Sequence, residues 1–166
     1  TDSSKLVRKL TTEHISIVLR NNLVLTFQEE VHGDTFLTIK ERIKASVGKT
    51  RTNGADYLLF ALMDVIVDTY FNTLNELEEH LDDIEDEIIK GSDKYKLRDI
   101  YNIKRDLSTI RKVIYPLRDL VAEIIRNQNN TIHPKTIPYF RDLYDHILQV
   151  IDSVDTHREL LTSLVD

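Results

Sequence analysis

Three aspartates, Asp64, Asp142 and Asp166, have the chemistry and placement of metal-binding residues. Asp64 interrupts an apolar stretch between Met63 and Val65, where an unpaired carboxylate would be costly, so it requires a partner or a cation. A salt bridge or a helix cap would also satisfy it. Asp142 and Asp166 lie among other carboxylates of the last predicted helix. If several copies of that helix surrounded an axis, such carboxylates could line a cation path or bridge subunits through a hard ion such as Mg²⁺.

A denser group of acidic residues occupies positions 76–87, mostly off the apolar positions of a predicted helix. A solvated helix face explains most runs of this kind. Two other interpretations remain: the run concentrates divalent cations, or it faces the basic stretch 40–51 of a neighbouring subunit, and both effects would be weakened by salt. Neither interpretation gives a specific site.

The sequence lacks the common signatures of catalysis. Gly48-Lys49-Thr50 is not a phosphate-binding loop, because the glycine required five residues before Gly48 is replaced by Ile43. Helical di-metal proteins need two Glu-x-x-His motifs, and this chain does not have two. It also has no zinc-protease spacing and no nucleophile elbow. We therefore expect that the chain is not an enzyme, and a metal-dependent helical hydrolase is the weakest hypothesis considered.

Composition narrows the possible partners. The 166 residues suit one domain, and the 28 acidic against 22 basic residues give a net charge of −6, which argues against nucleic-acid binding. Without cysteine, the chain can form neither disulfides nor thiolate metal sites, which fits a reducing cytosolic setting. The longest apolar stretch, 57–67, is much shorter than the roughly 20 residues that cross a bilayer. We expect no membrane span within this sequence.

The first part of the chain has the two-residue period of β-strands. Residues 14–19 and 23–28 are apolar and β-branched, and residues 20–22 between them favour a tight turn, so the pattern predicts a β-hairpin. Two strands alone are marginal in water, and we expect the hairpin to complete a larger sheet formed by preceding residues. A short helix is predicted over 35–45.

The rest of the chain has the period of long helices. Asn53 is the expected N-cap of a helix that runs to about residue 90, with Asp56 near the first-turn amides. After a break at 91–93, a second helix follows, in which Pro116 should cause a kink. Both helices have apolar residues in steps of three and four, so they should form an antiparallel hairpin roughly 50 Å long. The seam residues are Leu74, Leu77, Leu81, Ile84 and Ile88, then Ile103, Leu107, Ile110, Ile114, Leu117, Val121 and Ile124.

A third long helix is predicted from Ile137-Pro138, and its heptad pattern is still present at Asp166. This pattern indicates an oligomeric bundle. Because the sequence starts with Thr1 and ends without a helix stop signal, we expect it to be part of a larger protein.

Four separated segments carry a resemblance to a known family. They are 139–146 (YFRDLYDH), 115–118 (YPLR), 27–29 (FQE) and 54–64 (GADYLLFALMD). Together, and in the order in which they follow one another along the chain, they resemble the cytoplasmic part of CorA-type divalent-cation transport proteins, over about residues 14–166.

The resemblance implies a mainly α fold with an α+β start. Residues 1–34 would be the β-hairpin remnant of an N-terminal α/β domain, 35–136 a helical region with two long "willow" helices, and 137–166 a stalk helix leading to a transmembrane segment. The whole protein would be a homopentamer in the plasma (inner) membrane, with this part in the cytoplasm. Asp64 and Asp142 would contribute to one intersubunit Mg²⁺ site and Asp166 to another, with Co²⁺ also possible as the ion.

The function implied is therefore the gating portion of a Mg²⁺/Co²⁺ channel-transporter that senses Mg²⁺ between subunits. Two alternatives stay open. The zinc-transporting branch of the same superfamily shares the architecture, and a soluble coiled-coil scaffold without a metal role would explain the apolar seams equally well.

Overall fold

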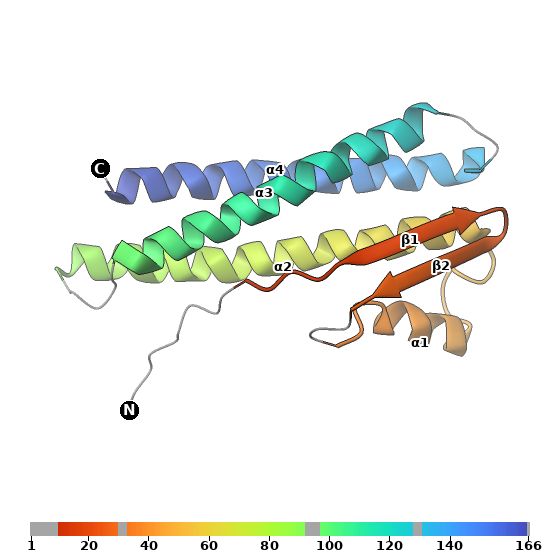
Figure 1. The fold of residues 1–166 in the computed structure, drawn as a ribbon, viewed down its shortest axis with the longest axis horizontal. Helices are drawn as coiled ribbons and strands as arrows, with labels where there is room; N and C mark the ends of the chain where they lie inside the picture. The colour runs from red at the N-terminus through yellow and green to blue at the C-terminus, as the bar shows by residue number, and fades with distance from the viewer. Residues whose placement is uncertain (1–9, 30–32, 92–96, 128–130, 166) are drawn as a thin grey trace. The chain divides into compact units, whose positions relative to one another are not determined.

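A computed structural model describes residues 10–29, 33–91, 97–127 and 131–165. The fold is mainly helical with one two-stranded sheet (Figure 1), as the sequence predicted. The elements, in chain order, are β1 (Ile15–Arg20), β2 (Leu23–Gln28), α1 (Leu37–Ala45), α2 (Ala55–Ile89), α3 (Leu97–Arg126), a short 3-10 helix (Pro134–Thr136) and α4 (Ile137–Val165).

The three long helices each contribute to two compact units. The helical unit consists of Thr1–Thr11, Tyr70–Pro116 and Gln149–Asp166, and the hairpin unit consists of Thr12–Thr69 and Leu117–Leu148. Each unit has its own buried side chains, so the two are described separately. The division of the chain at residues 34 and 136 that the sequence suggested stays a prediction.

The helical unit buries the apolar seams that the sequence predicted. Its core side chains recur every three or four residues on α2, α3 and α4, the spacing that places them on one face of each helix. Burial of each such side chain contributes about 1.5–3 kcal/mol. These residues are Leu74, Leu77, Leu81 and Ile84 on α2, Ile103, Leu107, Ile110 and Ile114 on α3, and Val150, Ile151, Val154 and Leu161 on α4.

The predicted seam of α2 stops before Ile88 in the structure. Ile88 was expected in the seam but is exposed, because it lies in the last turn of α2. Gly91 ends that turn in the left-handed conformation, with φ 65°, and its N–H donates to the carbonyl of Ile88 at 3.0 Å. Of the break predicted at 91–93, residues 92 and 93 lie outside the described part. Helix α3 continues through Pro116, and the kink expected there stays a prediction.

The hairpin unit begins with the predicted antiparallel pair of strands. Arg20 pairs with Leu23, so β1 and β2 are joined by a two-residue turn, in which Asn21 has a positive φ of 51°. Asparagine tolerates this conformation better than most residues, which explains its presence in the turn. One face of the hairpin packs against a core formed by Phe36 and Ile39 together with Ala61 and Leu62; the hairpin residues involved are Ile15, Ile17 and Val24.

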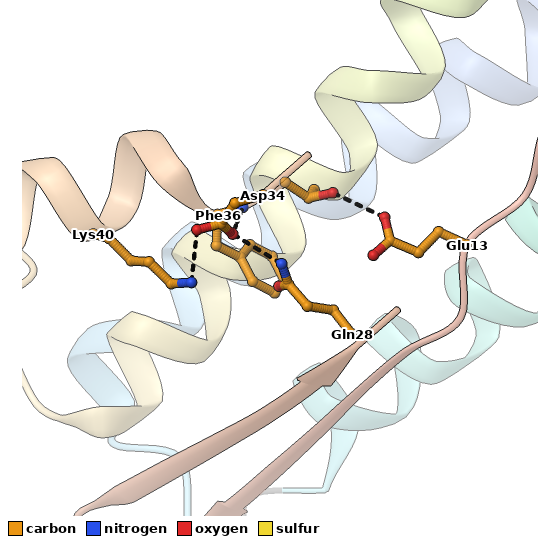
Figure 2. Close-up of polar contacts among 6 residues, drawn as sticks. Glu13, Gln28, Asp34, Phe36 and Lys40 are labelled. Atoms are coloured by element: carbon orange, nitrogen blue, oxygen red, sulfur yellow. Dashed lines mark hydrogen bonds and ion pairs between the residues drawn. The ribbon is translucent and has the colours of Figure 1, made fainter. Parts of the chain in front are cut away.

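A carboxylate joins β2 to the start of α1 (Figure 2). Asp34 accepts hydrogen bonds from the Gln28 side-chain amide at 2.9 Å and the Phe36 backbone N–H at 3.0 Å, and its other oxygen lies 2.6 Å from Lys40 Nζ. Lys40, followed by Gln28, lowers the pKa of Asp34 below its usual value. These bonds fix the turn before α1 and so hold Phe36 in the core.

Candidate metal-binding carboxylates

Asp64 lies on α2 in the hairpin unit, next to the buried side chain of Met63. Its side chain is 33% exposed, and its Oδ1 atom lies 3.5 Å from Nδ1 of His146 on α4. The sequence predicted that this carboxylate requires a partner or a cation. His146 is such a partner, although 3.5 Å is long for a hydrogen bond between these atoms.

The surroundings of Asp64 disfavour its ionised form. Burial raises the pKa of Asp64 above its usual value, and the nearby Asp68 carboxylate adds to the effect, whereas His146 and Arg42 act in the opposite direction without cancelling it. Burial removes hydration from the charged form of a carboxylate, and nearby positive charge can compensate for that loss. An additional cation nearby would therefore stabilise the ionised form of Asp64.

His146 is a residue that the sequence analysis did not assign to the site. It lies four residues after Asp142, and residues four apart share a face of a helix, so both are on the face of α4 that reaches Asp64. This spacing was the only available signal in the sequence, and it does not indicate which helix the face meets.

Of the other two predicted ligands, the structure describes Asp142 but not Asp166. Asp142 is exposed on α4, and Asp166 lies outside the described residues. Within residues 10–29, 33–91, 97–127 and 131–165, no three His, Asp or Glu side chains lie close enough together to hold a metal ion. A metal bound by Asp64 or Asp142 would therefore need ligands from water, from other residues of the protein or from a second chain.

Asp56 shows what a fully satisfied carboxylate looks like in the same unit. It is 6% exposed in the first turn of α2, and it accepts a hydrogen bond from the His133 backbone N–H at 2.9 Å. Burial alone would raise its pKa, but hydrogen bonds from the Thr136 side chain and from the N–H groups of His133, Tyr57 and Asp56 itself lower the pKa below the usual value. The predicted contact of Asp56 with first-turn amides is thus confirmed.

The start of α2 differs slightly from the prediction. The carbonyl of Gly54, and not that of Asn53, accepts the first helical hydrogen bonds, from Tyr57 and Leu58. Asn53 is therefore not the N-cap, which is one residue later. Gly54 is suited to this position because a Cβ there would lie 2.7 Å from the Asp56 carboxylate.

Aromatic side chains hold α2 and α4 together in the hairpin unit. Tyr57 and Phe60 of α2 lie with their ring centroids 5.0 Å and 5.3 Å from that of Tyr139 on α4. The Tyr139 hydroxyl also accepts a hydrogen bond from Lys49 at 2.8 Å. Much of the YFRDLYDH segment therefore has a packing role, and this packing positions Asp142 and His146.

Curated proteins of known name match the chain along almost its whole length. The cobalt/magnesium transport protein CorA of Thermotoga maritima is 38% identical over 162 residues, which are 98% of this chain and 46% of that protein. The chain thus spans about half the length of this relative.

Solved structures match the fold as well. The soluble domain of CorA from Methanocaldococcus jannaschii is 28% identical to this chain, with a TM-score of 0.78. The match covers 92% of this chain and 61% of the solved one. The complete CorA magnesium transporter of the same organism gives a TM-score of 0.76 at 28% identity. The match covers 90% of this chain and 47% of the transporter chain.

The likeness to a soluble domain bears on helix α2. This helix contains an 18-residue window with a mean hydropathy of 1.3, long and apolar enough to cross a membrane, and 22% of the window is buried. From the sequence, no helix of this kind was expected. The match to a soluble domain covers 92% of the chain, and the uncovered part is much shorter than the 35 residues of α2. We therefore assign α2 to the soluble part of the fold.

A family model described as CorA-like Mg²⁺ transporter protein matches residues 1–166, the entire sequence. A family of transporters is not a class of enzymes, in agreement with the expectation from the sequence. The predicted resemblance is confirmed by all three comparisons, and the chain belongs to the CorA-like Mg²⁺ transporter family.

Proposed function

We propose that this chain is the cytoplasmic regulatory portion of a Mg²⁺/Co²⁺ channel-transporter, and that it senses Mg²⁺ through carboxylates at subunit interfaces. Asp64 and Asp142 would contribute to one interfacial site and Asp166 to another. The whole protein would be a homopentamer, attached to the plasma (inner) membrane by segments that follow the stalk helix. In this arrangement residues 1–34 complete an α/β domain, 35–136 form the helical region and 137–166 the stalk.

The state of Asp64 is the observation that carries the metal-binding part of the proposal. Its carboxylate is two-thirds buried, and its pKa is raised by burial and by Asp68. In contrast, Asp56 in the same unit has enough donors to keep its pKa low. A divalent cation near Asp64 would supply the missing positive charge.

The ligand chemistry also favours a hard cation. Mg²⁺ prefers six oxygen ligands and keeps several of its waters, so one or two carboxylates from each chain are enough to hold it. Asp142 is exposed on the same face of α4 as His146, the partner of Asp64. A Mg²⁺ ion on this surface would be completed by water and by a second chain.

Regulation would follow from linkage between metal binding and assembly. Mg²⁺ that binds better to the closed ring than to other arrangements shifts the population toward the closed ring. When the ion leaves, facing carboxylates repel one another and loosen the interfaces. The proposal therefore predicts that metal binding rigidifies the whole assembly.

Two alternatives each have an observation in their favour. The buried seams of α2, α3 and α4 suit a soluble coiled-coil scaffold, which would form an oligomer that ignores Mg²⁺. The imidazole of His146 beside Asp64 suits the zinc-transporting branch of the superfamily, because nitrogen ligands favour Zn²⁺ over Mg²⁺.

Limited proteolysis of the full-length protein tests the proposal. With increasing Mg²⁺, the wild-type protein should become resistant to cleavage. Asp64→Ala, Asp142→Ala and Asp166→Ala should each raise the Mg²⁺ concentration needed for half-protection, by about tenfold for a lost charged ligand. Zn²⁺ is titrated in parallel, and protection by Zn²⁺ alone would favour the zinc branch.

Asp83→Ala is the matched control, because Asp83 is an exposed carboxylate on the same helix as Asp64. It removes the same charge and should leave the midpoint unchanged. Cleavage that is equal at all Mg²⁺ concentrations, in wild type and in the variants, would refute the proposal and favour the scaffold.

A further inference from the structure

The hairpin unit contains a cavity of about 540 Å³ that neither the metal sites nor the apolar core explains. Four separated segments line it: the β1–β2 turn, the start of α2, residues 131–134 and the first turns of α4. Its volume is within the roughly 300–1,000 Å³ of sites that bind small molecules.

The polar groups around the cavity include one cationic side chain and several neutral hydrogen-bonding groups. Arg141 lines it and has no ion-pair or hydrogen-bond partner among the described residues. His133 also lines it, and its Nδ1 atom accepts a hydrogen bond from the Lys135 N–H at 3.2 Å, so the neutral ring carries its proton on Nε2. Asn21, Asn22 and Thr131 also line the cavity, and each of these side chains carries both a donor and an acceptor.

Asp56 is the one carboxylate among the described lining residues, and it is already satisfied. It accepts hydrogen bonds from His133 and Thr136 and from the first turn of α2, and these bonds keep its pKa low. Asp56 therefore connects the start of α2 to the 131–136 segment, and a positively charged ligand would add little to its stabilisation. Among the lining residues that the structure describes, Arg141 is left as the charged group without a partner.

The remaining walls are apolar. Ala55, Ile132, Ile137 and Pro138 contribute hydrocarbon surface beside the donors. Inorganic ions do not use such surface, whereas a molecule with an apolar body and one charged end uses both parts. Arginine recognises carboxylate and phosphate groups through paired N–H donors.

We propose that this cavity binds a small organic oxyanion, with its carboxylate or phosphate on Arg141 and His133 and its apolar part against Ala55, Ile137 and Pro138. The site uses none of the three aspartates assigned to metal binding. It therefore adds an anion-binding function that is separate from Mg²⁺ sensing.

Equilibrium dialysis of the full-length protein tests this proposal, with phenyl phosphate, benzoate and inorganic phosphate as probes. The protein is first freed of divalent cations with a chelating resin, so the result does not depend on the proposed metal sites. Wild type should bind phenyl phosphate or benzoate saturably with one site per chain, and inorganic phosphate at least about tenfold more weakly. The organic probe that binds better identifies the charged group.

Two variants separate the charge from the cavity. Arg141→Gln removes the cation and should weaken binding by about tenfold or more. Ala55→Leu keeps every charge but fills part of the cavity, and it should weaken the organic probes more than inorganic phosphate. Arg158→Gln, on the same helix but outside the cavity, should leave all affinities unchanged.

Three results would overturn the proposal. They are no saturable binding of either organic probe to wild type, equal affinities in wild type and Arg141→Gln, and equal weakening by Arg158→Gln. The last two would indicate a general attraction of the probes to positive charge, not binding in this cavity.

Discussion

Different interactions stabilise the interior of each of the two units. The helical unit relies on apolar side chains that repeat along α2, α3 and α4, such as Leu107 and Ile114, both fully buried. The hairpin unit has a smaller apolar core and joins distant residues through single polar contacts. Examples are Asp56 with the N–H of His133, and Lys49 with Tyr139.

The helical unit is thus stabilised by uniform apolar packing, whereas the hairpin unit places individual polar groups in distinct environments. A repeated seam spreads its stabilisation over many similar contacts, and it has few groups that a ligand could bind. In the hairpin unit, each polar contact fixes one carboxylate or amine in a particular environment, so Asp56 and Asp64 on the same helix have pKa values shifted in opposite directions. Asp64, Asp142 and the cavity therefore lie in the unit where packing is less regular.

The largest expected effect is a cavity in the helical unit. Ile114→Ala should lower the free energy of unfolding by about 2–5 kcal/mol, because Ile114 is fully buried in the seam. Chemical denaturation measures the change. Val113→Ala is the control, since Val113 is exposed, and a loss of equal size in both variants would contradict the assignment of the seam.

A smaller loss is expected at the satisfied carboxylate of the hairpin unit. Asp56→Asn should cost about 1.5–3 kcal/mol at pH 7, because it removes hydrogen bonds to a charged group. The folded pKa of Asp56 is below its unfolded value of about 3.8, so the stabilisation is complete above that pH and is lost as the pH falls through the folded pKa. The cost of the variant should therefore shrink in acid.

The control for this prediction is Asp82→Asn, at an exposed position of α2. Its effect at pH 7 should be small. A penalty for Asp56→Asn that stays constant from pH 7 to well below the unfolded pKa would show that the charge of Asp56 does not contribute.

The smallest effect, with the opposite sign, is expected at Asp64. In the absence of divalent ions, Asp64→Asn should raise the stability at pH 7 by less than about 1 kcal/mol, since it removes a carboxylate that is partly buried with too little compensation. The folded pKa of Asp64 is raised, so this gain appears as the pH rises above the unfolded value of about 3.8.

Thermal unfolding in EDTA between pH 3 and pH 7 measures this difference. Asp83→Asn should show no comparable gain. A clear loss of stability in Asp64→Asn at pH 7 would mean that the ion pair with His146 outweighs burial, and Asp64 would then need no further cation.

The sequence predicted much of the backbone because periodicity and turn residues are local signals. The hairpin with Asn21 and Asn22 in its turn, the end of α2 just before Gly91 and the start of α4 at Ile137 all agree with the structure. Ile88 was placed in the seam by its spacing alone, which does not show where a helix runs out of neighbours.

The candidate sites depend on contacts between residues far apart in the chain. Asp64 could be identified as an unusual carboxylate from its apolar neighbours, but its partner His146 is on another long helix, and a single histidine carries no pattern. The cavity beside Arg141 was missed for the same reason, because its walls come from four segments. Tertiary packing determines these groupings, and local sequence does not specify it.

The central claim is that Asp64 and Asp142 bind the same interfacial Mg²⁺. The most direct measurement is the Mg²⁺ midpoint for protection of the full-length protein from proteolysis, in Asp64→Ala, Asp142→Ala and the double variant. Ligands of one ion act as a unit, so the double variant should shift the midpoint far less than the product of the two single shifts. Shifts that multiply fully would show two independent sites, and no shift in either single variant would contradict the account.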